Sequence, residues 1–152
     1  MRAVVQRVDE ARVTVDGQVV GKIGKGLLVY LGAGKGDADA DRAYVLSKIL
    51  GLRIFENDAG KMDKSIVDVR GALLVVSQFT LYGDVRRGRR PSFDDAMPPE
   101  DAERVYEAFV ADAKAQLHVE TGRFRAHMQV TATNNGPVTI WIDSAKSGSI
   151  IP

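Results

Sequence analysis

The residues of this sequence best suited to chemistry are four consecutive ones, Ser77, Gln78, Phe79 and Thr80. They follow residues 72–76, an apolar run typical of a buried strand, and polar residues at the exit of such a strand stand on a rigid base. Hydroxyl and amide groups donate and accept hydrogen bonds. Together with backbone N–H groups they can hold an ester carbonyl and stabilise its oxyanion. The alternative is a polar strand end that satisfies its own backbone, as many turns do.

A second candidate is the run Asn135-Gly136-Pro137. Asn-Gly is typical of a tight hairpin turn, and proline is tolerated at the first position of a strand, where its missing N–H matters least. These residues therefore predict a turn between strands at 128–133 and 138–142. Only about 5–6% of X–Pro bonds in folded proteins are cis, so the residues by themselves do not indicate a cis Gly136–Pro137 bond.

The third candidate is a cluster of four arginines within five positions, Arg86, Arg87, Arg89 and Arg90. Such a local cluster suits contacts with phosphates. The net charge of the whole chain is only +1, so its bulk electrostatics does not indicate a nucleic-acid binder. The alternative reading of the cluster is a solvated loop.

Several other kinds of site are excluded or unsupported. The chain has no cysteine, which rules out thiol catalysis, disulfides and Cys-based zinc sites. The two histidines, His118 and His127, lack the spacing of a metal-binding pair. There is no G-x-S-x-G segment for a nucleophilic serine, and the glycines at 31–37 match neither the dinucleotide fingerprint nor the P-loop. We therefore expect no metal site.

The N-terminal half of the sequence predicts strands. Residues 3–8 alternate, with Val4, Gln6 and Val8 on one face and Ala3, Val5 and Arg7 on the other. Arg7 therefore shares a face with small apolar neighbours. Asp16-Gly17 predicts a hairpin turn between strands at 12–15 and 18–23. The apolar run 26–31 predicts a strand covered on both faces.

Two helices are predicted, separated by a short strand at 52–55, a strand at 72–76 and a loop at 82–99. The first helix covers residues 37–50, with acidic residues in its first turn, Ala43, Leu46 and Leu50 at helical spacing, and Gly51 at its end. The second helix follows Pro98-Pro99, and its apolar stripe consists of Ala102, Val105, Tyr106, Phe109, Ala113 and Leu117.

These elements predict an α+β fold of about seven strands, in which two main helices pack on one face of a largely antiparallel sheet with a barrel-like core. The length of 152 residues fits a single domain, residues 1–152. The N-terminus lacks the apolar segment of a signal peptide, and no window reaches the about 18 apolar residues of a membrane span. We expect a soluble cytoplasmic protein that does not contact a membrane.

The sequence resembles the D-aminoacyl-tRNA deacylases over nearly its whole length. Seven segments occur in the order expected of that family: MRAVVQRV at 1–8, GLLVYLG at 26–32, LRIFEND at 52–58, GKM at 60–62, SQFTLYGD at 77–84, GRRPSF at 88–93 and NNGPVT at 134–139. The resemblance implies a homodimer with active sites at the subunit interface. It also implies hydrolysis of the ester that joins a D-amino acid to the 3′-terminal adenosine of tRNA, without a cofactor.

The resemblance further implies how mirror-image substrates are distinguished. The Gly136–Pro137 bond would be cis and would reach into the active site of the partner subunit, where its two carbonyls accept hydrogen bonds from the substrate α-ammonium group. An L side chain would then clash with this motif, which is specificity by steric rejection. Glycyl-tRNA, which has no side chain to reject, would be hydrolysed to some degree. Arg7 would brace the Gly-Pro turn.

For the reaction itself, the resemblance implies that Ser77 and Gln78 position the adenosine and the ester, while backbone N–H groups around Phe79 and Thr80 hold the oxyanion. Water would attack, assisted by the tRNA 2′-OH. Thr80 is a poor nucleophile because no candidate base is near it in sequence and an unactivated hydroxyl is weak. Phe124 and Met128 would wall the pocket.

The chain departs from the family pattern at Arg125-Ala126-His127, at Asn135, where an acidic residue is common, and within 83–87. These departures bear on the tRNA contacts.

Two alternative functions stay open. One is a related editing enzyme for another misacylated tRNA, such as one carrying L-alanine. The other is a non-catalytic tRNA-binding module that uses residues 86–90.

Overall fold

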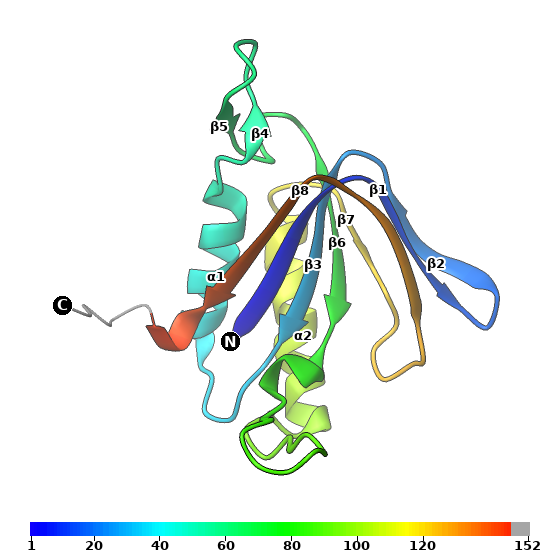
Figure 1. The fold of residues 1–152 in the computed structure, drawn as a ribbon, viewed down its shortest axis with the longest axis vertical. Helices are drawn as coiled ribbons and strands as arrows, with labels where there is room; N and C mark the ends of the chain where they lie inside the picture. The colour runs from blue at the N-terminus through cyan, green and yellow to red at the C-terminus, as the bar shows by residue number, and fades with distance from the viewer. Residues whose placement is uncertain (147–152) are drawn as a thin grey trace.

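The computed structural model describes residues 1–146, which form an α+β fold (Figure 1). A six-stranded sheet has the order β2-β1-β3-β6-β7, and β8 pairs with the other edge of β1. Its strands are β1 (Arg2–Val15), β2 (Gln18–Ile23), β3 (Gly26–Gly32), β6 (Ala72–Ser77), β7 (Val119–Thr121) and β8 (Gln129–Asp143). A separate hairpin pairs β4 (Phe55–Glu56) with β5 (Met62–Lys64), so the short strand expected at 52–55 lies slightly later.

The sheet is mixed, and this corrects part of the expectation of a largely antiparallel sheet. Within residues 1–146, β1 pairs antiparallel with β2, β3 and β8, whereas β3–β6 and β6–β7 are parallel. The parallel pairs arise because the chain crosses back through α1 (Asp39–Gly51) between β3 and β6, and through α2 (Pro99–Lys114) between β6 and β7. Crossovers of this kind join parallel strands.

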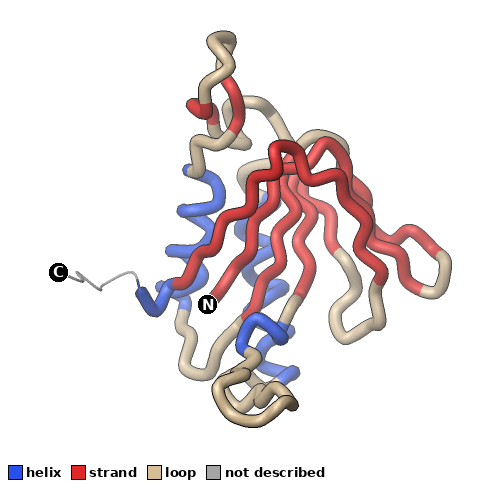
Figure 2. Tube along the Cα trace, in the orientation of Figure 1, coloured by secondary structure: helices blue, strands red, loops and turns tan. Residues whose placement is uncertain are grey.

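Both helices lie on the far side of the sheet in the view of Figure 1. Figure 2, in the same orientation, shows the curved strands of the sheet on the side that faces the viewer. Alternate residues of β3 and β6 therefore enter two cores. Leu27, Val29 and Val75 pack under the helices with Phe109, while Leu28 and Leu74 belong to a second core with the far half of β1 and with β2. This arrangement explains the continuous apolar run of β3, which was predicted to be covered on both faces.

The predicted first hairpin is confirmed, and β1 is longer than expected. It is continuous from Arg2 to Val15 and pairs first with β3 and then with β2. Asp16 and Gly17 connect it to β2 with φ angles of 49° and 77°, the two positive values that the favoured two-residue hairpin turn requires. Ala3, Val5 and Arg7 share one face, as predicted, and the structure shows that all three are buried.

The first helix is shorter than predicted and buries different residues. It begins at Asp39, because Asp37 caps the preceding turn by accepting a hydrogen bond from the Gly34 N–H at 2.7 Å. Its buried residues are Val45, Leu46 and Ile49, whereas Ala43 is exposed. The predicted spacing was therefore right for Leu46 and for Leu50, which packs partly buried against the core, and wrong for Ala43. The buried residues of α2 are Tyr106, Phe109, Val110 and Ala113, in agreement with most of the predicted stripe.

The hairpin turn predicted at Asn135-Gly136 is wrong. The chain does not reverse there, and β8 runs alongside β1 from Gln129 to Asp143. Gln6 pairs with Thr139 and Val8 with Asn134, so residues 135–138 bulge out of the ladder. The physical reason is the length of β1. One continuous partner strand offers pairing to both halves of β8, and a bulge accommodates the extra residues.

The two ends of the curled sheet come together where β2 meets β7, so that the sheet is nearly closed. A Cβ added to Gly21 of β2 would lie 2.2 Å from the backbone oxygen of Thr121 in β7. No side chain fits such an approach without movement of the backbone. Glycine at position 21 therefore allows this closure.

Within the described part of the chain, no helix is long and apolar enough to cross a bilayer.

Replacing Gly21 with alanine is expected to lower the free energy of unfolding by about 1–3 kcal/mol, the usual effect of overpacking. Urea denaturation monitored by circular dichroism measures this change. Gly24→Ala is the matched control, because a Cβ at that position would meet nothing within 4 Å. Equal stability of the two variants would show that the contact between β2 and β7 does not constrain the fold.

Candidate active site

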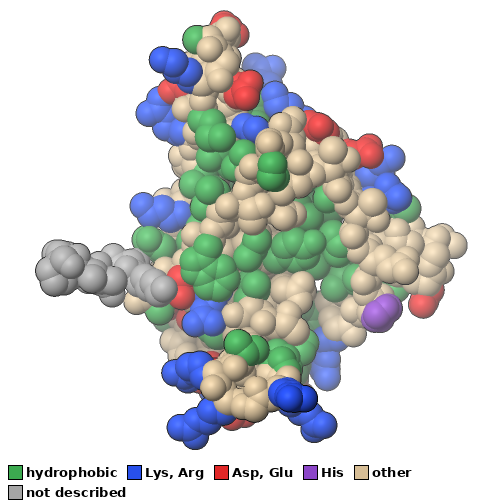
Figure 3. Space-filling view, in the orientation of Figure 1, with side chains coloured by type: hydrophobic (Ala, Val, Ile, Leu, Met, Phe, Trp, Pro, Cys, Tyr) green, Lys and Arg blue, Asp and Glu red, His purple; other side chains and the backbone are tan. Residues whose placement is uncertain are grey.

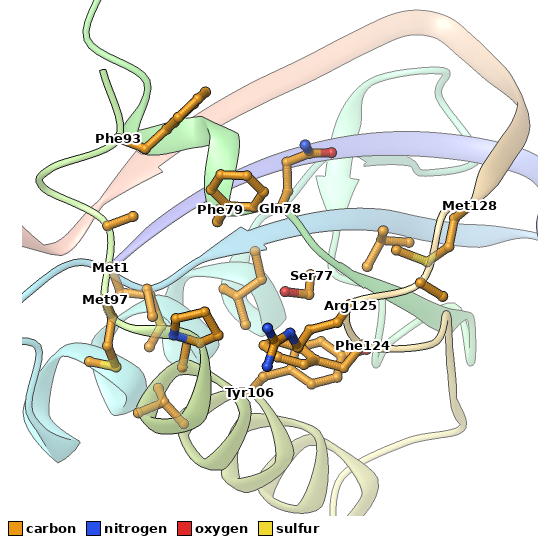
Figure 4. Close-up of a pocket in the computed structure, with 18 of the residues that line it drawn as sticks. Met1, Ser77, Gln78, Phe79, Phe93, Met97, Tyr106, Phe124, Arg125 and Met128 are labelled. Atoms are coloured by element: carbon orange, nitrogen blue, oxygen red, sulfur yellow. The ribbon is translucent and has the colours of Figure 1, made fainter. Parts of the chain in front are cut away.

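A pocket of about 660 Å³ opens at the carboxyl end of β6 (Figure 4). Open α/β sheets bind ligands at this end of their parallel strands. Ser77, Gln78 and Phe79 lie on one side, and Tyr106 of α2, Phe124 and Arg125 lie opposite. The other lining residues are Met1, Leu31, Ala33, Val76, Phe93, Ala96, Met97, Pro99, Ala102, Val105, Ala126, His127, Met128 and Val130.

The end of the β3–β6 ladder exposes hydrogen-bond donors at this pocket. The Gln78 N–H makes the last ladder bond, to the Leu31 oxygen at 2.8 Å, and the 3₁₀ helix η1 (Phe79–Tyr82) follows. The first N–H groups of a helix have no acceptor within it. In residues 1–146 no other group bonds the N–H of Phe79 or of Thr80. Two backbone donors are therefore available beside the pocket.

The structure brings three of the four residues Ser77–Thr80 to the pocket wall. Ser77 and Gln78 are half-buried, and Phe79 is exposed but lines the pocket. Thr80 is exposed and does not line it. Its Oγ1 accepts a hydrogen bond from Gln78 Nε2. Phe124 and Met128 also line the pocket, and their predicted roles as walls agree with this placement.

Tyr106 is a pocket residue that the sequence pattern assigned only to the core. Its hydroxyl donates to the Val75 oxygen at 2.8 Å, and its ring lies 5.7 Å from that of Phe124. Burial raises the pKa of Tyr106 to about 12, so the hydroxyl stays protonated and keeps donating at neutral pH. A tyrosine within an apolar stripe needs a partner for its hydroxyl, and this requirement was the available sequence clue.

The ionisable character of the pocket is set by few groups. Among the described residues that line it there is no carboxylate, and the charged or titratable side chains are Arg125, His127 and Tyr106. In the same part of the chain no cluster of three His, Asp or Glu residues could hold a metal ion. Two of the residues that depart from the family pattern, Arg125 and His127, therefore lie at the pocket wall.

Gly136 and Pro137 do not line the pocket of their own chain. Both are exposed, and the bond between them is cis. Arg7, only 7% exposed, lies beneath this bulge. Its Nε and Nη2 donate to the backbone and side-chain oxygens of Asn135, each at 3.2 Å, and its Nη1 donates to the Ile54 oxygen at 2.6 Å. One guanidinium thus ties the bulge to a neighbouring loop.

The arginine cluster lies at the end of a loop beside the pocket. A backbone bridge between Asp84 and Ser92 closes this loop, and all four arginines are exposed. Figure 3 shows blue side chains gathered around it at the bottom of the molecule. A side-chain hydrogen bond from Arg86 lowers the pKa of Asp84 to about 2. Phe93, in the same segment, contacts Phe79 edge-on with ring centres 5.0 Å apart.

Comparisons with known proteins find a matching family model and closely related sequences. The family model for D-Tyr-tRNA(Tyr) deacylase matches residues 4–143. A D-aminoacyl-tRNA deacylase of Sorangium cellulosum is 60% identical over 149 residues, which is 97% of this chain and 99% of the relative. That of Kosmotoga olearia is 57% identical over 146 residues, which is 96% of this chain and 99% of the relative.

Two solved structures share the fold. One, described as c-Myc DNA Unwinding Element Binding Protein, has a TM-score of 0.90 and 42% identity, covering 94% of this chain and 98% of its own. The other, described as a probable eukaryotic D-amino acid tRNA deacylase, has a TM-score of 0.78 and 18% identity, covering 93% and 97%. With a family model over most of its length and relatives at 57% and 60% identity, the chain belongs to the D-Tyr-tRNA(Tyr) deacylase family of hydrolases.

Proposed function

We propose that this chain, as one domain, forms a cytoplasmic homodimer that hydrolyses the ester bond of D-aminoacyl-tRNA and rejects L-aminoacyl-tRNA by means of a motif supplied by the partner subunit. The observation that carries the proposal is the pocket at the end of β6. Ser77 and Gln78 line it, two backbone N–H groups without an acceptor in residues 1–146 lie beside it, and no carboxylate of the described chain lines it. Such a site binds and polarises an ester rather than attacking it with an acidic side chain.

In the proposed reaction Ser77 and Gln78 position the 3′-terminal adenosine and the ester carbonyl. The N–H groups of Phe79 and Thr80 stabilise the oxyanion as water attacks. Electrostatic stabilisation of this kind makes the largest contribution to the rate enhancement of many acyl-transfer enzymes. The tRNA 2′-OH assists the attacking water. Phe124 and Met128 form the wall. The exposed position of Thr80 outside the pocket lining supports water, rather than this hydroxyl, as the nucleophile.

The proposed chiral filter is the Gly136–Pro137 bulge of one subunit, inserted into the pocket of the other. Its carbonyls accept hydrogen bonds from the substrate α-ammonium group, so that an L side chain points into the motif and clashes. Glycyl-tRNA passes because it has no side chain. The exposure of the bulge and its attachment to Arg7 support this role.

A protein interface on the sheet is supported by its apolar surface. Figure 3 shows hydrophobic side chains spread across the face turned toward the viewer. Trp141, on the same strand as the bulge, is 48% exposed. Exposed apolar patches of this kind mark interaction sites. The remaining part of the substrate, the tRNA backbone, would be bound by Arg86, Arg87, Arg89 and Arg90, which are exposed beside the pocket.

The test is hydrolysis of matched D-tyrosyl-tRNA, L-tyrosyl-tRNA and glycyl-tRNA by the full-length chain. We expect rapid release of D-tyrosine, slower release of glycine and no release of L-tyrosine above the uncatalysed rate. Equal rates on the two tyrosyl enantiomers would refute the chiral filter. Tight, salt-dependent tRNA binding without turnover would instead favour a non-catalytic binding module.

A further inference from the structure

Three side chains linked by hydrogen bonds, those of Arg7, Asn135 and Asp9, hold the bulge that contains Gly136. Arg7 Nη2 donates to Asn135 Oδ1 at 3.2 Å, and Asn135 Nδ2 donates in turn to Asp9 Oδ1 at 2.7 Å. The backbone oxygen of Asn135 is bonded to Arg7 as well. Both the side chain and the backbone of Asn135 are therefore held by hydrogen bonds. Asp9, the last of the three linked residues, has none of the roles described above.

The sheet register explains why Asp9 faces the bulge. Val8 pairs with Asn134 and Glu10 with Thr133, so Asp9 is the extra residue of β1 at this point of the ladder. An extra residue in a bulge is unpaired, and the local twist redirects its side chain. The irregularity in β1 thus lies next along the ladder to the larger one in β8, which faces Arg7, and the two are joined by the contact between Asp9 and Asn135.

An amide is well suited to the middle position among these three side chains. Its oxygen accepts from the guanidinium while its NH₂ group donates to the carboxylate. Arg7 can only donate and faces the amide oxygen, whereas the Asp9 carboxylate can only accept and faces the NH₂ group, so the two residues together fix the orientation of the Asn135 amide. Without an acceptor at position 9 the amide keeps only its bond to Arg7, and the side chain before Gly136 loses one of its two anchors.

We infer that Asp9 is a positioning residue for chiral discrimination: acting through the Asn135 amide, it aims the carbonyls of the Gly136–Pro137 bulge. This inference rests on the proposed function of the bulge. The charged groups around the contact are Arg7, Lys25 and Glu56, which line a cavity of about 150 Å³ together with Asp9 and Asn135. Of these, only Arg7 and Asp9 are bonded to Asn135.

The first measurement compares Asp9→Ala with the unmodified protein on D- and L-tyrosyl-tRNA. We expect the ratio of L to D hydrolysis to rise about 3- to 10-fold, the range that corresponds to one hydrogen bond. A residue that only supported the fold would lower both rates together and leave the ratio unchanged. An unchanged ratio in a folded Asp9→Ala protein would therefore overturn the inference.

Exchanging the two side chains gives the sharper test. Asn135→Asp alone places two carboxylates in contact, and one of them must bind a proton to restore the hydrogen bond. We expect its L-to-D ratio to be raised at about pH 8 and to return toward the unmodified value at about pH 5. The double variant Asp9→Asn/Asn135→Asp restores the bond with its direction reversed, so its ratio should stay within about 2-fold of the unmodified protein across this range.

The outcomes separate this inference from the function on which it rests. Failure of the unmodified protein to prefer the D substrate would refute the proposed filter itself. A normal preference with no rescue by the double variant, and no pH dependence in Asn135→Asp, would refute only the role of Asp9. Thermal unfolding of each variant identifies those that are folded, and the double variant keeps the test open if Asp9→Ala does not fold.

Discussion

Gln78→Ala is expected to lower kcat for D-tyrosyl-tRNA hydrolysis by about 10²-fold, the usual consequence of misplacing the reacting groups by about 1 Å. Gln78 lies at the pocket wall, immediately after the last residue of β6. Its loss removes the amide that holds the ester but leaves the backbone ladder bond to Leu31 in place. Single-turnover kinetics with excess enzyme measures the chemical step free of product release.

Thr80→Ala is the matched control for that loss, because Thr80 is the hydrogen-bond partner of the Gln78 side chain and lies outside the pocket lining. We expect it to retain activity within about 10-fold of the unmodified protein, since only one neutral hydrogen bond is removed. A folded Thr80→Ala protein that binds substrate but has lost nearly all turnover would identify Thr80 as the nucleophile and contradict the proposed attack by water.

Arg7→Met is expected to raise the ratio of L- to D-tyrosyl-tRNA hydrolysis by about 10- to 100-fold, as expected from the 1.5–3 kcal/mol of hydrogen bonds to a charged group. Arg7 is buried and donates to Asn135 and Ile54, so methionine fills a similar volume but leaves these acceptors without their donor. The same loss should reduce the free energy of unfolding by about 1–3 kcal/mol. Parallel deacylation assays and urea denaturation measure the two effects.

Arg12→Met provides the comparison on the same strand. Arg12 also lies on β1, and no side-chain hydrogen bond involving it is present among residues 1–146. We expect its selectivity and stability to match those of the unmodified protein. Loss of selectivity in both variants would mean that the positive charge on β1, rather than the clamp on the bulge, controls discrimination.

Local sequence features were sufficient where the controlling interactions are themselves local. The turn at Asp16-Gly17 forms as predicted, because positive φ angles are accessible to these residues and the flanking strands pair with each other. The polar exit of β6 was also predictable. Its apolar run must be buried, and Ser77 is the first residue at which the chain leaves that core.

Asn135-Gly136 shows where the same reasoning fails. The dipeptide has the composition of a hairpin turn, yet the chain bulges there without reversing, because β1 is long enough to pair with both halves of β8. A local turn preference does not outweigh a ladder of backbone hydrogen bonds, each of which contributes about 0.5–1.5 kcal/mol. The cis bond before Pro137 was expected from family resemblance alone.

The sequence by itself determined the first hairpin, the polar end of β6 and the face that Arg7 shares with Ala3 and Val5. Those properties follow from alternation and apolar runs over a few residues. Only the tertiary structure decided that Arg7 meets Asn135, at positions 128 residues apart. Such meetings depend on strand register and on partners distant in the chain, which local periodicity does not encode.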